Sequence, residues 1–565
     1  MKTNYIYTVL CILFIIGCGG GSTHNNTPEC PESNDSSRKK IIITDDIHVE
    51  SLGMESNIHI NLKTGNTPKD IFILFSNYSP SETANISIRH NNAIANHTQY
   101  TALKKEVPNR LSHILHTPAR IHQFIKNIHN NPRFERVLSP HKSRIMPVRR
   151  ANIIGESKEF YLDLYTSPSS IATLQQIVSS VQTDQGSKTL NIWVSNDSFD
   201  SGSGCSKQRC ITQTMVNSLA NNFLKSGSNN DIYDWVTNIY GKAWGNDAQL
   251  MDNNLIAEND EITILLTDID NDNSPEGGVL GYFYPKDNYK NTSFSGSNER
   301  IMFYIDSVMF ANYDDETWDI DDYWPKEIIS TLAHEFQHMI HFYQKDILLN
   351  TETETWLNEM LAEGTEDLVA TKILNTGPRG VDYIDGSAGV SGNTLGRYPI
   401  FNAHNIESLT HWGNGLSDYA HVNSFGAFLL RNYGGADLFH NIVHNVYGDE
   451  DAIVSAINQN ANDAKTFNDL LKEWGTGVML SDQTNLQSLP SYNSGDFTYS
   501  EYNGVSYALG SVNFFNYSPY PMMHSSTGIV RPQANYYYKV GSNISGNIDI
   551  DLTLNGTVEA TLICK

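Results

Sequence analysis

His334, Glu335 and His338 form the pattern His-Glu-x-x-His. On an α-helix, side chains four positions apart lie on one face, because the helix turns once in about 3.6 residues. The two imidazoles would then project together, at a separation that suits two ligands of one zinc ion. Glu335 would point about 100° around the helix, beside the metal, where a carboxylate can take a proton from water. The pattern therefore predicts a zinc site with its own general base.

A helix is expected around these residues, in the interval from Pro325 to Lys345. Pro325 follows an acidic run and suits the first turn of a helix, while Lys345 would complement the dipole at the other end. Apolar residues recur between them at helical spacing, and they form a stripe on a different face from the two histidines. Ordinary surface histidines on an amphipathic helix are the alternative to a metal site.

A second helix is expected shortly afterwards, capped by Thr353 or Thr355 and bearing Glu359 and Glu363. The two glutamates are four positions apart and so share a face. One carboxylate could complete a zinc site, and the other could hold a ligating histidine through the ring nitrogen that does not face the metal. Two exposed acids on a helix are the alternative.

With this second motif the chain resembles the gluzincins, the thermolysin-like metallopeptidases that carry two histidines on one helix and a glutamate on the next. The segment from Asn358 to Glu363 matches their second-helix pattern of Asn-Glu, two variable residues, a small residue and an acid. The resemblance implies that Glu359 is the third zinc ligand and that Glu363 is the outer partner of His334. Asn358, which begins the motif, belongs with Glu363 to the residues around the ligands.

A metzincin site does not fit the residues that follow. That pattern requires a glycine three positions after the second histidine and a third histidine three positions later, where this chain has His341 and Gln344. We therefore interpret His341 as a packing or rim residue.

A wider resemblance adds the segment Asp418-Tyr419-Ala420-His421 and is to the hyicolysin-type bacterial metallopeptidases. It is specific over about residues 320–370 and weaker over the rest of 156–480. It implies hydrolysis of protein or peptide substrates, with zinc polarising the scissile carbonyl and Glu335 deprotonating the attacking water. Tyr419 and His421 are candidates for stabilising the oxyanion, although their spacing does not force either residue near the metal.

The order of expected elements indicates an α+β protein with a zincin-like metallopeptidase domain. Residues 156–482 are assigned to that domain, with a mixed sheet, the active-site helix and a mostly helical C-terminal lobe. Within it, the strand from Arg300 to Ile305 is the candidate edge strand for binding extended substrate. Short β runs on either side predict an N-terminal β module at 41–100 and a C-terminal β module at 483–565.

The interval 101–155 has an excess of positive charge, whereas the chain as a whole is acidic. The whole sequence has a formal net charge of −25, which argues against nucleic acid as a partner. Residues 101–150, by contrast, contain eleven Lys and Arg against two acids and end in Arg149-Arg150. A prosegment cut near that dibasic pair is one interpretation, and a basic linker lying on an acidic body is the other.

The first residues have the features of an export signal. An apolar run that ends at Ile16 is too short for an ordinary membrane span and precedes Gly17-Cys18, which resembles the lipobox of bacterial lipoproteins. The resemblance implies removal of residues 1–17, a lipid anchor on Cys18 and a flexible tether over 18–40. We expect an exported, membrane-anchored lipoprotein at the cell surface or outer membrane; a plain signal peptide and a short anchor helix are the alternatives.

Two disulfides are expected, because four cysteines remain once the signal and the lipid-bearing residue are set aside, and the compartment is oxidising. Cys205 and Cys210 are near enough in sequence to close a small loop. A bond between Cys30 and Cys564 follows by elimination.

An acidic turn follows the expected strand at 262–266. Asp268, Asp270 and Asp272 alternate with other residues, as oxygen ligands do in calcium loops, but the glycine and terminal glutamate of an EF-hand are missing. The turn could hold calcium or could be a solvated loop.

Taken together, these features predict an extracellular zinc-dependent endopeptidase. Two other functions stay open: a surface-anchored adhesin or host-protein-binding lipoprotein with a non-catalytic zinc site, and a zinc-binding lipoprotein without turnover. Neither explains the acid at Glu335, because a structural zinc site has no need of a base.

Overall fold

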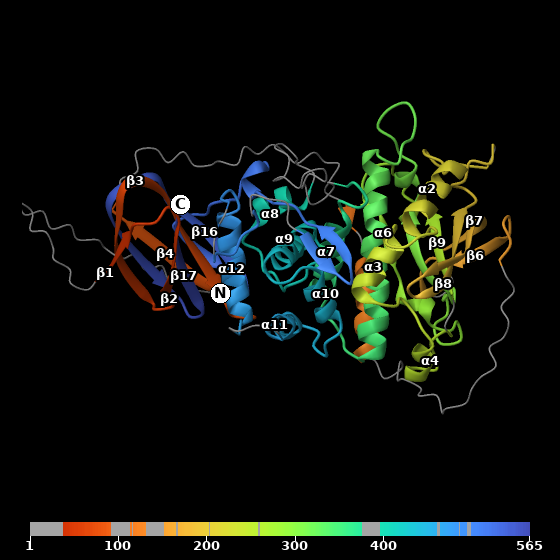
Figure 1. The fold of residues 1–565 in the computed structure, drawn as a ribbon, viewed down its shortest axis with the longest axis horizontal. Helices are drawn as coiled ribbons and strands as arrows, with labels where there is room; N and C mark the ends of the chain where they lie inside the picture. The colour runs from red at the N-terminus through yellow and green to blue at the C-terminus, as the bar shows by residue number, and fades with distance from the viewer. Residues whose placement is uncertain are drawn as a thin grey trace, which may run out of the picture.

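The computed structural model shows an elongated molecule (Figure 1). A β-sheet domain lies at one end, a six-stranded sheet with its helices lies at the other, and a group of helices lies between them. The residues that the structure describes are 38–91, 114–115, 117–130, 152–164, 168–202, 204–257, 260–375, 396–459, 464–484, 486, 488–493 and 499–565.

The β-sheet domain is built from both ends of the chain. Strand β3 lies between β16 and β17, so that N-terminal strands are inserted among C-terminal ones. The prediction of two separate modules at 41–100 and 483–565 is therefore wrong, because both contribute to one seven-stranded sheet of order β15-β4-β16-β3-β17-β2, with β1 parallel to β3. Its strands are β1 (Lys39–Ile43), β2 (His48–Gly53), β3 (Asn57–Asn77), β4 (Ala84–His90), β15 (Thr527–Val530), β16 (Ala534–Leu554) and β17 (Val558–Cys564).

Alternating apolar residues fix the register of this sheet. In β3, Ile58 and Ile60 are buried while the residues between and beside them face outward. They pair with Leu552 and Ile550 of β16, which are also buried. A slip of one residue would turn the apolar side chains of the shifted strand toward solvent, so the apolar pattern holds the two ends of the chain together in one alignment.

The second sheet supports the helix that bears the two histidines. Its order is β11-β12-β9-β8-β7-β6, with β8, β9 and β12 parallel and the other neighbours antiparallel. The strand expected at the edge lies inside the sheet as β12 (Ile301–Asp306), and the edge is β11 (Gly281–Phe283). Every residue of β12 is buried, as is typical of interior parallel strands. The other strands are β6 (Ser157–Tyr161), β7 (Ser169–Thr183), β8 (Gly186–Ser195) and β9 (Glu261–Thr267).

Two short strand pairs complete the described β structure. Strand β5 (Ile114–Leu115) pairs in parallel with β10 (Gly278–Val279), which lies just before the edge strand β11. Strands β13 (Tyr499–Tyr502) and β14 (Val505–Ala508) form a small hairpin.

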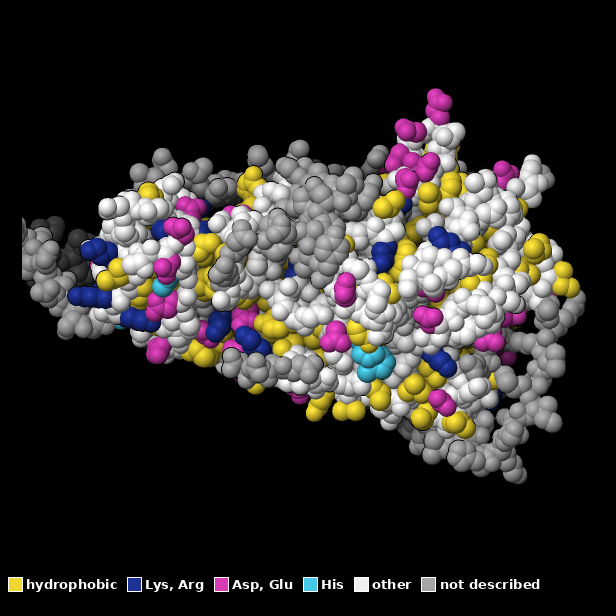
Figure 2. Space-filling model, in the orientation of Figure 1, with side chains coloured by type: hydrophobic (Ala, Val, Ile, Leu, Met, Phe, Trp, Pro, Cys, Tyr) yellow, Lys and Arg dark blue, Asp and Glu magenta, His cyan; other side chains and the backbone are white. Residues whose placement is uncertain are grey.

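Helix α6 (Tyr323–His341) packs against β11 and β12 and continues into a π-helical segment, η6 (Phe342–Leu348). Helix α7 (Thr355–Val369) packs on α6, and α9 (Leu416–Asn432) packs on α7. The loop between α5 and α6 projects from the molecule and gathers acidic side chains (Figure 2). The other helices are α1 (Ala119–Asn130), α2 (Gln213–Phe223), α3 (Ile232–Tyr240), α4 (Asp247–Met251), α5 (Ser307–Phe310), α8 (Arg397–His404), α10 (Ala436–Val443), α11 (Glu450–Asn458) and α12 (Phe467–Met479).

The chain is thus an α+β protein, with helices that follow α7 forming a lobe between the two sheets (Figure 1). Cys205 and Cys210 form a disulfide. Cys564 is buried in β17 and forms no disulfide with a described residue. The expected signal at 1–17, the lipid site at Cys18 and the expected partner Cys30 lie outside the described residues. Within the described ranges, no helix is long and apolar enough to cross a membrane.

Candidate metal centre

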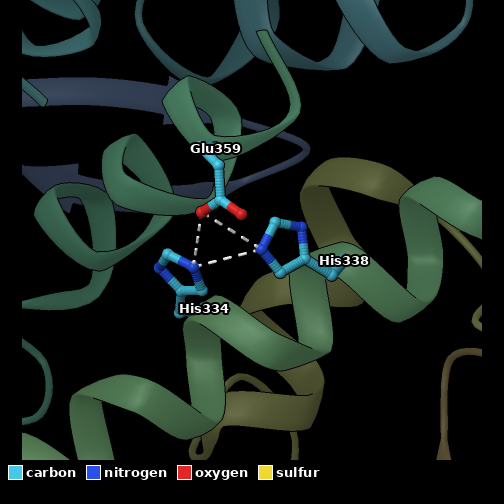
Figure 3. A group of neighbouring side chains, drawn as sticks. All are labelled: His334, His338 and Glu359. Atoms are coloured by element: carbon cyan, nitrogen blue, oxygen red, sulfur yellow. Dashed lines mark hydrogen bonds and ion pairs between the residues drawn. The ribbon is translucent and has the colours of Figure 1, made fainter. Parts of the chain in front are cut away.

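Helix α6 is buried along almost its whole length, and its two faces have different neighbours. Phe336 packs against Phe303 of the sheet and against Phe223 of α2. His334 and His338 lie two positions to either side of Phe336, which is about 200° around the helix, and they face α7 instead (Figure 3). The amphipathic pattern of α6 therefore decides which side of the helix presents the imidazoles.

Three donor atoms converge between α6 and α7 (Figure 3). Nε2 of His334 lies 3.1 Å from Nε2 of His338 and 3.2 Å from Oε2 of Glu359. The distance from Nε2 of His338 to the same oxygen is 3.5 Å. His334 and Glu359 are wholly buried, and His338 is nearly so. The sequence pattern and the fold thus bring together the three residues that were predicted as metal ligands.

The geometry fits one small divalent cation. Zinc ligands lie about 2.0–2.2 Å from the metal, which sets neighbouring donors of a tetrahedral site about 3.3–3.5 Å apart, close to the observed distances. Two imidazole lone pairs and a carboxylate facing one another in a buried space repel unless a cation lies among them. Oε1 of Glu359 accepts no hydrogen bond from the described residues, and its neighbour at 3.3 Å is Nε2 of His122. Two nitrogens and one carboxylate oxygen form a donor set that zinc accepts.

The imidazole of His334 is oriented by Glu366. Its Nδ1–H donates to Oε1 of Glu366 over 2.8 Å, which leaves Nε2 facing the other ligands. The resemblance implied Glu363 for this role, and that prediction is wrong. Glu363 instead accepts hydrogen bonds from the guanidinium of Arg397 at 2.7–3.1 Å and from the side-chain amide of Asn423.

Protons and a metal ion compete for His334. Burial lowers the pKa of this imidazole, but the carboxylates of Glu359 and Glu366 outweigh burial and raise the pKa well above its ordinary value. A metal ligand must be deprotonated, so binding of a metal displaces this proton and weakens as the pH falls.

The second imidazole is oriented by Asn358, one of the residues predicted to surround the ligands. Nδ1–H of His338 donates to Oδ1 of Asn358 over 3.1 Å. Because Asn358 directly precedes Glu359, one turn of α7 supplies both a ligand and the group that orients another ligand. His341 lies outside this set, and its Nε2 is 2.9 Å from Oγ1 of Thr353, in keeping with a packing residue.

Glu335 lies beside the three donors and is held by the edge strand. The backbone N–H of Phe283 in β11 donates to Oε2 of Glu335 over 2.7 Å, whereas Oε1 has no hydrogen-bond partner in the described part of the chain. Burial raises the pKa of Glu335, while the charges of His334 and His338 act in the opposite direction. A carboxylate with a raised pKa and one unengaged oxygen can accept and return a proton near neutral pH.

The two oxyanion candidates lie on different sides of α9. Tyr419 is buried and lies close to the metal group: its hydroxyl is 3.4 Å from the backbone nitrogen of Thr117, whose Oγ1 is 3.5 Å from Nε2 of His338. Burial together with the negative charges of Glu359 and Glu335 raises the pKa of the Tyr419 hydroxyl well above its ordinary value. His421 comes two positions later, about 200° around the helix, and its ring packs against Phe401. The prediction of His421 as a site residue is therefore wrong.

The acidic turn after β9 is neutralised by cationic side chains rather than arranged as a metal site. Nζ of Lys207 lies 2.7 Å from Oδ2 of Asp268, and Arg120 approaches Asp270 at 3.8 Å. Across the described ranges, Asp268, Asp270 and Asp272 are not among the groups whose ligand atoms converge within 4.8 Å. The structure gives no support to calcium at this turn.

Sequence reasoning did not anticipate four residues at the site: Glu366, Arg397, Thr117 and His122. Glu366 could have been found, because an acid seven positions after Glu359 shares its face of the helix. His122 comes from the basic interval, and its Nε2 lies 3.3 Å from Oε1 of Glu359. Burial lowers the pKa of His122 to about 4, which makes the ring neutral at pH 7. No local pattern signals such a long-range contact.

Comparison with known proteins points to the same part of the chain. The sequence profile of the family described as Peptidase M30 matches residues 168–549, an interval that includes all three metal-ligand candidates. The neutral metalloprotease ShpI of Staphylococcus hyicus is 26% identical over 243 residues, which are 41% of this chain and 50% of that protein. The match thus spans about half the length of this relative.

Replacement of Glu366 by alanine should lower the metal affinity about 10- to 100-fold, because His334 would lose the carboxylate that fixes its orientation. The affinity is measured by competition with a chromophoric chelator. Glu354→Ala, at the exposed start of α7, is the control and should leave the affinity unchanged. An unchanged affinity for the Glu366 variant, with its circular dichroism spectrum intact, would contradict the assigned role.

Proposed function

The chain belongs to the peptidase M30 family, and from that premise we propose that it is a zinc-dependent endopeptidase. The observation that carries the proposal is the convergence of His334, His338 and Glu359, with Glu335 one residue beyond the first of them. Two imidazoles and one carboxylate leave a fourth tetrahedral position open, which is typical of catalytic rather than structural zinc. The same donor set supports a zincin-like layout of the gluzincin type.

Glu335 acts as the general base and then as the general acid. Zinc in this site would lower the pKa of a contacting water molecule and polarise the scissile carbonyl. Glu335 accepts a proton from the attacking water through Oε1, while the N–H of Phe283 holds the carboxylate in place through Oε2. The same group then protonates the departing amine. One water is consumed and the products are a carboxylate and an amine, so Glu335 returns to its starting state.

Tyr419 is the proposed donor to the oxyanion that develops on the substrate carbonyl. Its raised pKa keeps the phenol protonated, and so able to donate a hydrogen bond, at neutral pH. In the structure this hydroxyl lies 3.4 Å from the carbonyl oxygen of Thr117, the same chemical group that a peptide substrate would offer.

Extended protein or peptide substrates are expected along β11. As the edge of its sheet, β11 (Gly281–Phe283) presents main-chain groups on the side away from β12, and an extended chain can pair with such groups. Phe283 on this strand also holds Glu335. A substrate paired with β11 would therefore lie beside the base.

We further propose that the protein is exported as a lipoprotein, anchored through Cys18 at the cell surface or outer membrane. Support comes from the apolar run before Gly17-Cys18 in the sequence and from the Cys205–Cys210 disulfide, which suits an oxidising compartment. The net charge of −25 argues against nucleic acid as a partner.

Glu335→Gln should keep the metal and lose peptide hydrolysis by roughly 10²- to 10⁴-fold in kcat, since an amide cannot take the proton. Hydrolysis of a quenched fluorescent peptide is measured with and without a chelator, and the bound metal is measured by mass spectrometry. Undiminished hydrolysis by the variant would refute the assigned base. Protein binding without hydrolysis by the native sequence would favour the alternative, a surface adhesin with a non-catalytic zinc site.

Tyr419→Phe should lower kcat by roughly 10²-fold with little change in KM, because the lost hydrogen bond forms only as the oxyanion develops. His421→Gln is the control on the same helix, and its kcat per folded molecule should match that of the native sequence. Equal losses in the two variants would indicate that α9 contributes packing alone.

Cys18→Ser should abolish incorporation of labelled palmitate and move the protein from the detergent phase to the aqueous phase in a phase-separation assay. Cys11→Ser, within the expected signal, is the control and should leave both properties unchanged. Retention of the lipid label in Cys18→Ser would refute the anchor site.

A further inference from the structure

A short segment that precedes the catalytic domain lies directly over the metal group. Oγ1 of Thr117 is 3.5 Å from Nε2 of His338, and Nε2 of His122 is 3.3 Å from Oε1 of Glu359. The hydroxyl of Tyr419 lies 3.4 Å from the backbone nitrogen of Thr117 and 3.4 Å from its carbonyl oxygen. The segment therefore contacts the ligand nitrogen of His338, the second carboxylate oxygen of Glu359 and the proposed oxyanion donor at once.

Helix α1 (Ala119–Asn130) continues this segment and is packed into an apolar groove beside the site. Ile121 and Phe124 are buried, and Ile121 lines one pocket together with Phe283 of the edge strand and His338. The ring of Phe124 makes edge-to-face contacts, with centroids 5.1–6.5 Å apart, with three aromatic rings: Tyr284, Tyr289 and Phe294. Such burial fixes the position of α1 more firmly than the polar contacts alone could.

The charges of this segment complement the surface beneath it. Nε of Arg120 lies 3.4 Å from Oδ2 of Asp163, and His129 lies 2.8 Å from Asp346. Lys126 approaches a further acid, Glu354, at 4.0 Å. Two of the eleven Lys and Arg residues in the basic interval 101–150, Arg120 and Lys126, thus lie beside acidic partners on the body of the protein.

We infer that residues 114–115 and 117–130 belong to an inhibitory segment that occupies the substrate-binding cleft and keeps the intact chain latent. The inference rests on the proposed function. The segment pairs through β5 with β10, just before the edge strand β11 along which an extended substrate is expected. Thr117 approaches His338 and His122 approaches Glu359, which are two of the three donor residues.

Relief of inhibition is expected from a cut in the interval 131–151, which contains Arg149 and Arg150. Another protease or a second copy of this enzyme would hydrolyse one peptide bond there, with one water consumed and a carboxylate and an amine formed. The family profile begins at residue 168, so the inhibitory segment lies outside the part of the chain that the family shares.

A cut in this interval would not release the N-terminal strands. Strand β3 pairs with both β16 and β17, and β4 pairs with β15 and β16. Removing these strands would expose the apolar core of the seven-stranded sheet. After the cut, the two fragments would therefore stay associated through the sheet, and both would remain attached to an anchor at the N-terminus.

Peptide binding tests the inhibitory role in the full chain. Each protein carries Glu335→Gln, which prevents self-cleavage, and is loaded with zinc. A fluorescently labelled extended peptide is titrated by anisotropy. The pair Arg120→Glu and Phe124→Ala, which weakens docking of α1, should tighten binding at least tenfold. The pair Gln123→Ala and Asn127→Ala, on the exposed face of the same helix, is the control and should bind like the parent.

Limited digestion with trypsin gives a readout that does not depend on activity or on the peptide. Cleavage after Arg120 and Lys126 should be slow in the parent and in the control pair. In the loosened pair, which lacks Arg120, cleavage after Lys126 should be at least tenfold faster. Hydrolysis by the corresponding chains with Glu335 restored should rise in the same order.

The outcomes separate this inference from the proposed function. Equal peptide binding and equal hydrolysis by all the proteins would overturn the inhibitory role and leave the peptidase assignment intact. Absence of both binding and hydrolysis in the loosened pair would overturn the proposed function and the inhibitory role with it.

After a cut between 130 and 152, the two fragments that separate on a denaturing gel should elute as one peak in native size exclusion. Separate elution would overturn the two-fragment form.

Discussion

The burial of several carboxylates between α6 and α7 is the constraint on which the rest of the site depends. Glu335, Glu359, Glu363 and Glu366 are all removed from water. Charged groups tolerate such burial only when they are paired or bound to a cation. Arg397 satisfies Glu363, and the Nδ1–H of His334 satisfies one oxygen of Glu366. A metal ion bound by His334, His338 and Glu359 would therefore balance buried negative charge in addition to its role in hydrolysis.

Packing from two sides keeps these groups in place. The sheet fixes α6 through Phe336, and the helical lobe fixes α7 through residues of α8 and α9. Gly426 permits the close approach of α9, since a Cβ atom there would lie 3.2 Å from the carbonyl oxygen of Met360 on α7. The approach also brings Tyr419 close to the ligands, so the distance between two helices determines whether the oxyanion donor can reach the reaction.

Local periodicity explains what the sequence could predict. His334, Glu335 and His338 follow from helix geometry, whereas the choice of Glu359 over Glu363 as the third ligand came from the resemblance to gluzincins. The structure brings these four residues together. The choice between Glu363 and Glu366 depends on the rotation of α7 and on Arg397 from a distant helix, which no spacing reveals. The sequence does not distinguish Tyr419 from His421 as the oxyanion donor until it is known which face of α9 points toward the metal ligands. The single sheet made from both chain ends was missed for the same reason, because pairing of β3 with β16 is not encoded locally.

Attachment to the same chain explains how modest contacts could hold the inhibitory segment in the cleft. Thr117 and His122 approach the ligands at 3.3–3.5 Å, and exposed ion pairs such as that of Arg120 contribute little in water. An intramolecular ligand, however, acts at an effective concentration on the order of millimolar, well above most substrates. A cut after α1 would free only one end, because the other end continues to strands that remain in the sheet. The segment would then compete with substrate instead of excluding it, so a single cut after α1 is enough to relieve the inhibition.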